Sequence, residues 1–347
     1  MMTLKIRKRV EKELKNYIRE LDTSYSLSKI SPVLYANIKE FISRQGKRIR
    51  PILFVIGYLG YAKKAAAGLY RSAVSIELLH DFMLVHDDII DKSDTRRGRP
   101  SMHSMLNRYL SGNKNAKFNG EDLTIVIGDV MFALAMHAFL GIREDEKRKE
   151  RALKKLIEAA IYTGSGEFIE LLYGLKKLER ITKEDIYRVY DYKTANYTFA
   201  SPLAIGATLA GARQDEIDKL VKYGIYLGRA FQINDDILGM FGSEKKTGKS
   251  NLTDLKEAKK TILIWHAYKN SSPKTRLIIK RLLSKSNIGK SDLLRMRGIL
   301  NCSGTLDYAA REIDALIKKA EFINKTLKMQ PRYLNLLNSL SKEILSL

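Results

Sequence analysis

The stretch "LLHDFMLVHDDIIDKSDTRRGRP", Leu78–Pro100, places three carboxylates within five residues of an otherwise apolar segment and then two arginines. Carboxylates this close repel one another, and burying a charge without a partner is very costly. The stretch therefore predicts a cationic partner for the carboxylates and an anionic ligand for the arginines. These residues are Asp87, Asp88, Asp91, Arg96 and Arg97.

Helical spacing turns part of this cluster to one face. Residues i and i+4 share a face of an α-helix, so Asp87 and Asp91 should point the same way. His80 and Met83 continue that face toward the start of the helix. Clustered oxygen ligands without cysteine favour a hard cation such as Mg²⁺. In the alternative interpretation, the aspartates cap the helix or form salt bridges with the arginines.

A second carboxylate pair, Asp235 and Asp236, lies 148 residues later (235 minus 87), in "FQINDDILGMFG". It also lies in an apolar run, where solvated surface charge is a poor explanation. Two carboxylate helices facing each other would form a metal clamp, and Mg²⁺ usually completes its shell with water and substrate phosphate. The two pairs together predict a diphosphate ligand.

Several basic residues accompany these motifs. Each alone is typical of a solvated surface. Together they supply more charge than one diphosphate needs, which favours two diphosphates, one held through metal and one by Arg, Lys and His alone. The residues are Lys47, Arg50, Arg96, Arg97, Lys193, Lys249, Lys259 and Lys260.

The rest of the 347 residues predicts an all-α protein. Apolar residues recur at helical spacing, and no alternating segment persists as a strand would require. The longest apolar candidate, Pro51–Ala62, is too short for a membrane span. The charged start lacks the apolar region of a signal peptide, and the single cysteine, Cys302, excludes an internal disulfide. We therefore expect a cytoplasmic protein.

The net charge of +23 favours anionic partners, among them nucleic acid, acidic membrane surfaces and phosphorylated small molecules. A non-enzymatic, helical nucleic-acid-binding protein would explain this charge. However, no basic helix carries interleaved stacking aromatics, and acidic groups within apolar helices oppose that function. Phosphorylated small molecules remain the favoured ligands, and peripheral contact with a membrane stays open.

Eight short motifs follow one another along the chain: "GKRIRP", "ELLH", "HDDIIDKSDTRRGRPSMH", "GD" at Gly128-Asp129, "YKTA", "GRAFQINDDILG", "TGK" and "KKT". Their order resembles that of the trans-isoprenyl diphosphate synthases, or polyprenyl synthetases. The resemblance is strongest from Gly46 to Thr261 and implies a helical bundle around a central apolar cavity. It also implies a single domain over residues 1–347 and a homodimer.

The resemblance implies a role for each matching residue. Three aspartates would ligate Mg²⁺, three ions in all, around an allylic diphosphate: Asp87, Asp91 and Asp235. Asp88 and Asp236 complete the two motifs. Four cations would contact the same diphosphate: Arg96, Lys193, Lys249 and Lys259. Four residues would hold isopentenyl diphosphate without metal: Lys47, Arg50, His80 and Arg97. Thr194 and Gln232 would line the cavity near the reacting carbons.

The implied reaction is ionisation of the allylic diphosphate, attack by isopentenyl diphosphate on the allylic cation, and loss of a proton, with water excluded. The residues expected to set product length are Met83 and Phe82. Helix geometry places Met83 beneath Asp87 and rotates Phe82 by about 140° away, so that Phe82 would form a side wall or project between neighbouring helices. One aromatic there favours the twenty-carbon geranylgeranyl diphosphate over farnesyl or longer products.

Two positions depart from the family pattern. Gly239 replaces a third aspartate and leaves two carboxylates in the second motif. Glu167 stands where glutamine is common, and it would either pair with a nearby lysine or alter the cavity.

Two other kinds of protein have related sequences and are alternatives to a synthase. A class I terpene cyclase needs no second diphosphate pocket, and a non-catalytic partner subunit commonly lacks the intact aspartate motif found here.

Overall fold

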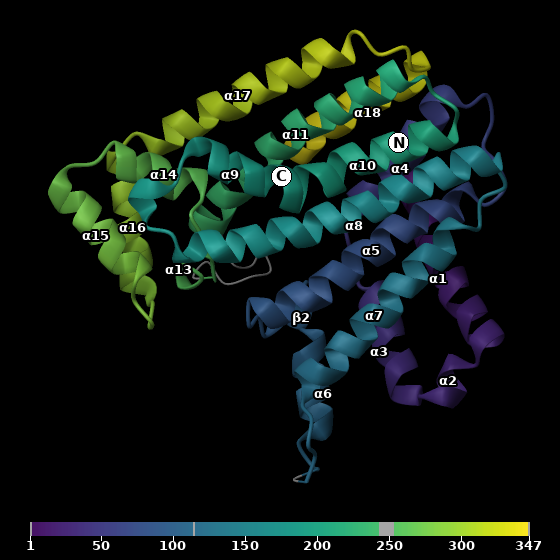
Figure 1. The fold of residues 1–347 in the computed structure, drawn as a ribbon, viewed down its shortest axis with the longest axis horizontal. Coiled ribbons are helices and arrows are strands. Elements are labelled where there is room, and N and C mark those ends of the chain that lie inside the picture. Colours follow the sequence, from purple (N-terminus) through teal and green to yellow (C-terminus); the bar gives the residue numbers. More distant parts are fainter. Residues whose placement is uncertain (1, 114, 243–252, 346–347) are drawn as a thin grey trace. The chain divides into compact units, whose positions relative to one another are not determined.

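The computed structural model describes residues 2–113, 115–242 and 253–345. Helices make up almost all of the regular structure (Figure 1), which confirms the predicted all-α class. The exception is a small antiparallel hairpin of β1 (Thr95–Arg96) and β2 (Arg99–Pro100) directly after the first aspartate motif. Gly98 adopts a φ of +72° in its turn, a conformation that favours glycine.

The chain forms two compact units, and each is described by itself. The first comprises residues 1–156, 202–213 and 329–336, and the second comprises residues 157–201, 214–328 and 337–347. A single domain over residues 1–347 therefore stays a prediction. The helices of the first unit are α1 (Met2–Tyr25), α2 (Leu27–Ile30), α3 (Pro32–Ser43), α4 (Ile49–Tyr61), α5 (Leu69–Ile90), α6 (Met102–Leu110) and α7 (Gly120–Phe139), with parts of α8 (Glu146–Leu175), α10 (Ser201–Leu209) and α18 (Pro331–Leu345).

The second unit contains the remainder of α8 and α18 together with the elements between them. These are η1 (Leu178–Arg180), α9 (Lys183–Val189), η2 (Tyr190–Ala200), α11 (Gln214–Phe241), α13 (Thr253–Lys256), α14 (Ile262–Lys269), α15 (Pro273–Leu283), α16 (Lys290–Cys302) and α17 (Thr305–Asn324).

Helix α5 lies within the first unit, against α1, α4 and α7. Figure 1 shows α5 and α7 running side by side. Most of α5 before its aspartates is buried, and α4 is buried along nearly its whole length. A Cβ atom at Gly57 of α4 would lie 2.4 Å from the carbonyl oxygen of Leu203, so α4 meets α10 backbone to backbone. This tight packing fixes the scaffold that carries the first aspartate motif.

Helix α7 is long and apolar enough, by length and composition, to cross a membrane. The sequence predicted no such helix, because polar residues interrupt the apolar run of α7. Core helices pass the same test, and 44% of the α7 window is buried within the protein. Its contacts with α5 and α6 are those of a core helix.

Helix α11 lies against η2 and α17 in the second unit. A Cβ atom at Gly224 would lie 2.5 Å from Ala200 Cα, and one at Gly228 would lie 2.4 Å from Ala195 Cα. These glycines therefore bring α11 directly onto η2. Gln232 and Asp236 follow at the same four-residue spacing, so the glycine stripe aims both side chains toward η2.

Element η2 is a π-helix of 11 residues that contains the "YKTA" motif. The sequence analysis expected only a helix here. π-helical turns are rare and frequently occur at functional sites. The spacing of apolar residues in the sequence does not distinguish a π-helix from an α-helix here. A segment of 11 residues spans too few turns to separate a period of 3.6 residues from a slightly longer one.

Candidate active site

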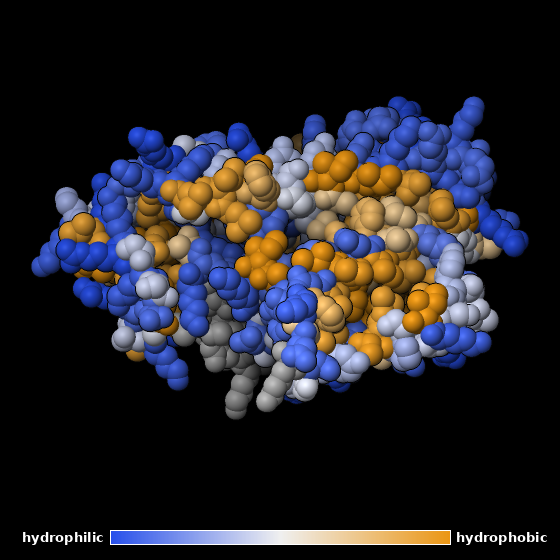
Figure 2. All heavy atoms as spheres, turned by 60° about the horizontal axis from the view of Figure 1, so that its bottom comes forward, coloured by the Kyte–Doolittle hydropathy of each residue, from blue (hydrophilic) through white to orange (hydrophobic). Residues whose placement is uncertain are grey.

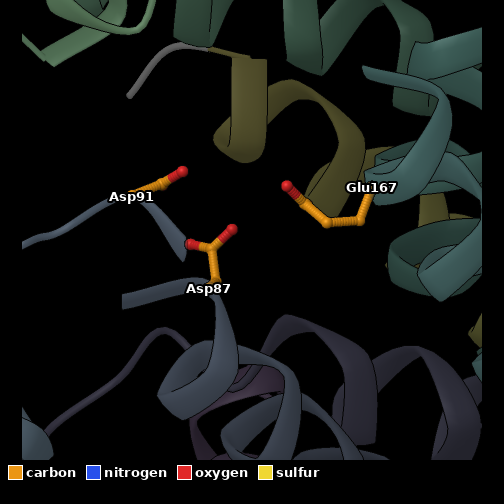
Figure 3. Close-up of side chains that lie close together, drawn as sticks. All are labelled: Asp87, Asp91 and Glu167. Carbon is orange, nitrogen blue, oxygen red and sulfur yellow. The ribbon is translucent and has the colours of Figure 1, made fainter. Parts of the chain in front are cut away.

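The first aspartate motif lies at the end of α5. The helix ends at Ile90, and the backbone N–H of Asp91 still donates to the Asp87 carbonyl at 2.8 Å. Carboxylate oxygens of Asp87 and Asp91 lie within 4.8 Å of each other. Figure 3 shows these two side chains. Its third labelled residue, Glu167, belongs to the second unit and is described below together with Lys193. The predicted shared face is present.

Asp88 is buried and lies about 100° around α5 from Asp87. Its Oδ1 accepts from Arg96 Nε at 2.7 Å, and Arg96 Nη2 donates to Asp87 Oδ2 at 2.9 Å. Burial would lower the pKa of Arg96, but Asp88 and Asp87 raise it, so Arg96 stays charged. The salt-bridge alternative thus holds for Asp88. Asp87 and Asp91 present an oxygen-only donor set one helical turn apart, which fits Mg²⁺.

The second motif divides in the same way. Asp236 is buried, and its two oxygens accept from the Tyr190 hydroxyl and, at 2.9 Å, from Gln232 Nε2. Gln232 in turn accepts from the Thr194 hydroxyl at 2.7 Å. Asp236 therefore orients the two predicted cavity residues rather than facing solvent. Asp235 is exposed, because adjacent residues on a helix are rotated by about 100° and Asp235 therefore faces different surroundings from Asp236.

The predicted lysines of the second unit have carboxylate partners. Lys193 Nζ lies 2.5 Å from Glu167 Oε2 and 2.5 Å from Glu170 Oε2. Glu167 thus pairs with a lysine, which was one of the two possibilities left open. Lys259 pairs with Glu257 at 2.7 Å. Lys249 lies outside the described residues.

Four residues were predicted to bind a diphosphate without metal: His80 lies on α5, Arg97 in the turn of the hairpin that follows it, Arg50 on α4 and Lys47 before α4. Arg97 has a φ of +55°, and its Nη2 lies 3.3 Å from Asp81 Oδ1 and 3.8 Å from Glu77 Oε1. Its Nη1 is buried and has no hydrogen-bond acceptor among the described residues. Burial and the nearby guanidiniums of Arg50 and Arg97 lower the pKa of His80, so the imidazole is neutral at pH 7. Lys47, in the loop before α4, is exposed.

Three residues of this region were missed by the sequence analysis: Arg48, Glu77 and Asp81. Arg48 is buried and donates to Glu11 and Glu77, and Glu77 is itself buried. The signal was in the sequence. Glu77 and Asp81 are four residues apart in an apolar helix, and Asp88 is two turns further on, so all three share one stripe. An acidic stripe within an apolar helix predicts buried cations, and Arg48 is one of them.

Phe82 and Met83 lie on the first turns before Asp87. The Phe82 ring packs against Phe132 of α7, with centroids 5.3 Å apart, and edge-to-face on His86 at 4.8 Å. A Cβ atom at Gly128 of α7 would lie 2.1 Å from His86, so that glycine makes room for this packing. Phe82 therefore projects toward a neighbouring helix, as the rotation predicted. Met83 is half-buried.

Comparison with known proteins agrees with this geometry. The sequence model of the Polyprenyl synthetase family matches residues 31–297. The chain belongs to this family. A short chain isoprenyl diphosphate synthase of Methanocaldococcus jannaschii is 31% identical over 88% of this chain and 84% of its own length. A geranylfarnesyl diphosphate synthase of Aeropyrum pernix is 34% identical over 81% and 84% of the two chains.

Solved structures of the family share this fold. A geranylgeranyl pyrophosphate synthase of Corynebacterium glutamicum, complexed with isoprenyl diphosphate and magnesium, superposes with a TM-score of 0.89 over 98% of both chains at 26% identity. One from Pyrococcus horikoshii gives a TM-score of 0.80 at 28% identity over 99% and 97% of the two chains. This polyprenyl synthetase is accordingly a prenyltransferase of isoprenoid biosynthesis, and the terpene cyclase and nucleic-acid-binding alternatives find no support.

Proposed function

We propose that this polyprenyl synthetase uses Mg²⁺ to condense isopentenyl diphosphate with an allylic diphosphate and releases the twenty-carbon geranylgeranyl diphosphate. The observation that carries the proposal is that α5 and its following hairpin present two chemically different groups of side chains, each suited to an anion. One is the carboxylate pair of Asp87 and Asp91 beside Arg96, which suits a metal-bound diphosphate. The other is the half-buried Arg97, whose Nη1 is buried, near a neutral His80; this pair suits a diphosphate without metal.

Asp87 and Asp91 would hold Mg²⁺ around the allylic diphosphate, and Asp235 of the second unit is the third proposed ligand by its motif. Bound Mg²⁺ supplies Lewis-acid stabilisation of negative charge on the departing diphosphate. We propose three ions, as in the family pattern. Arg96, Lys193 and Lys259 would contact the same diphosphate, and the lysines would exchange their carboxylate partners for it. Lys249 would join them by its motif.

Thr194 and Gln232 would line the cavity near the reacting carbons. Their mutual hydrogen bond, continued from Gln232 to Asp236, supports a fixed orientation of both side chains. Lys47 and Arg50 would join His80 and Arg97 around isopentenyl diphosphate. A loop lysine such as Lys47 can reach an anion once bound, because its side chain is long and flexible.

Turnover tests the proposal directly. The purified protein is expected to incorporate labelled isopentenyl diphosphate into farnesyl diphosphate in the presence of Mg²⁺, and excess chelator should abolish incorporation because the allylic diphosphate then loses its metal contacts. Restoring Mg²⁺ should restore the rate. Activity that persists in chelator would overturn the metal assignment, and salt-sensitive DNA binding without turnover would overturn the function.

Phe82→Ala is expected to lengthen the products beyond twenty carbons. The substitution removes the ring packed between His86 and Phe132, which opens space beside the turn that precedes Asp87. Reversed-phase chromatography of dephosphorylated products from a farnesyl primer measures the change. Phe322→Ala, at an exposed aromatic on α17, is the matched control and should leave the product distribution unchanged. An unaltered distribution in Phe82→Ala would show that another side chain limits product length.

We also propose a cytoplasmic homodimer. Apolar side chains at helical spacing are largely exposed on the part of α8 in the second unit: Phe168, Leu171, Leu172 and Leu175. Apolar patches are visible on the face drawn in Figure 2. An exposed apolar stripe of this kind supports burial against a second copy of the chain. The basic surface is compatible with peripheral contact with an acidic membrane.

A further inference from the structure

The buried carboxylate of Asp81 has an unusual arrangement. It lies in the apolar part of α5 and is fully buried. Its Oδ1 faces Arg97 Nη2 at 3.3 Å, whereas its Oδ2 is buried without a hydrogen-bond partner among the described residues. An ionised carboxylate buried with one oxygen unsatisfied is costly. A structural ion pair would normally satisfy more of its oxygens, so Asp81 is poorly explained as a simple anchor for Arg97.

Three guanidiniums and three carboxyl groups, Asp81 included, form one charged group in the free protein. They come from its own helix, the loop before α4, α4 itself, the hairpin and α1. The guanidiniums are Arg48, Arg50 and Arg97, and the carboxylates are Glu11, Glu77 and Asp81. His80 is neutral. A diphosphate bound by Arg97 adds at least two negative charges to this group, which favours protonation of the carboxyl group whose pKa is already raised, that of Asp81.

We propose that Asp81 is a positioning residue that holds Arg97 in the free pocket. When isopentenyl diphosphate binds, its diphosphate replaces Asp81 as the partner of Arg97, and Asp81 takes up a proton. The inference rests on the proposed function of this pocket. In the free pocket the carboxylate of Asp81 takes the place of the diphosphate. It keeps the guanidinium of Arg97 charged and oriented before the substrate binds. Protonation then removes the repulsion between Asp81 and the bound diphosphate, and the new O–H can donate a hydrogen bond.

The titration of Asp81 makes this exchange possible near neutral pH. Burial raises the pKa of Asp81 to about 7, with Glu77 adding to the effect and Arg97 opposing it. A bound anion raises the pKa further. Because the bound state then holds more protons than the free state, affinity is full below pH 7 and falls as the pH rises through the pKa values of the free and bound states. Glu77 does not respond in this way, because Arg48 and Arg97 lower its pKa despite its burial.

Titration calorimetry of isopentenyl diphosphate without Mg²⁺ or allylic substrate tests the proposal, since only the metal-free site then binds. Measurements in two buffers of different ionisation enthalpy give the number of protons taken up. Between pH 7 and 9 the wild-type protein should take up part of one proton, and its affinity should fall by up to about tenfold per pH unit. The ligand's own phosphate proton, with a pKa of about 6, contributes little in this range.

Asp81→Asn keeps the shape of the side chain and mimics its neutral form. It should bind isopentenyl diphosphate with little pH dependence, and more tightly than the wild type at pH 8.5. Asp81→Leu removes the acceptor for Arg97, so it should raise KM for isopentenyl diphosphate while kcat at saturation changes little. A KM for Asp81→Asn at or below the wild-type value would separate positioning of Arg97 from a general packing role.

Two results would overturn the proposal. The first is a wild-type protein that binds isopentenyl diphosphate with no proton uptake above pH 7; this needs no variant and is independent of folding. The second is equal proton uptake by the wild type and Asp81→Asn. In either case turnover with Mg²⁺ would be intact, so the proposed function would stand. Absence of turnover in the wild type would instead overturn the proposed function.

Discussion

Asp87→Asn is expected to lower kcat by about 10²- to 10³-fold, the loss typical of removing one group that stabilises developing charge. The substitution keeps the size of the side chain but replaces a charged Mg²⁺ ligand with a neutral one. It also leaves Arg96 with fewer anionic partners, although Asp88 still holds it. Steady-state kinetics at saturating substrates, measured over a range of Mg²⁺ concentrations, should show both a lower kcat and a higher Mg²⁺ requirement.

The control for this variant is Asp218→Asn. Asp218 is an exposed carboxylate on α11 that accepts a hydrogen bond from Gln214, and it should retain wild-type kcat. Circular dichroism of the variants would establish that their folds are equal. Wild-type kcat and an unchanged Mg²⁺ requirement in Asp87→Asn would exclude Asp87 as a ligand and leave its salt bridge to Arg96 as its role.

The aspartate motifs were predictable because their spacing carries geometric information. A four-residue step places Asp87 and Asp91 on one face, and the structure has their oxygens within 4.8 Å. The division within each adjacent pair was not predicted. Asp88 binds Arg96, and Asp236 binds Tyr190 and Gln232, because neighbouring positions on a helix face different surroundings. Which neighbour faces inward depends on packing that no short motif specifies.

The carboxylate partners of the predicted lysines were also not predictable from the sequence. Lys193 meets Glu167 and Glu170 through contacts between α8 and η2, and Gly166 allows that approach: a Cβ atom there would lie 2.7 Å from the backbone nitrogen of Lys193. These ion pairs form only because α8 and η2 pack against each other at this position. The sequence analysis could state only that Glu167 would pair with a lysine or change the cavity. Local patterns predict the helices, whereas long-range contacts decide which charges meet.

Arg48 is the clearest example of a residue whose role depends on the fold, because the acidic stripe of α5 predicts a buried cation without indicating which arginine it is. The motif "GKRIRP" presents Lys47, Arg48 and Arg50 as three basic residues, and the sequence analysis assigned ligand binding to Lys47 and Arg50 alone. In the structure the side chain of Arg48 is 0% exposed, whereas Lys47 is exposed. Arg48 donates to Glu11 at 2.7 Å, to Glu77 at 2.5 Å, and to the carbonyls of Ile42 and Arg44.

Arg48→Met is therefore expected to lower the free energy of unfolding by about 3–5 kcal/mol, the usual loss when one partner of a buried ion pair is removed. Methionine fills much of the volume but leaves Glu77 buried without its closest cation. Denaturant titration measures the loss. Arg99→Met is the matched control: its side chain is 62% exposed and pairs with Glu40, so the loss should stay below about 1 kcal/mol.

The pH dependence of this loss identifies its cause. Burial alone would raise the pKa of Glu77, but Arg48 and Arg97 lower it in the folded protein, so the pair contributes stability above the unfolded pKa of glutamate and loses it as the pH falls through the lowered value. In Arg48→Met the pKa of Glu77 should rise. The difference in stability between wild type and variant should consequently be largest at neutral pH and shrink in acid. A difference that is constant with pH would indicate lost packing around the arginine rather than an uncompensated carboxylate.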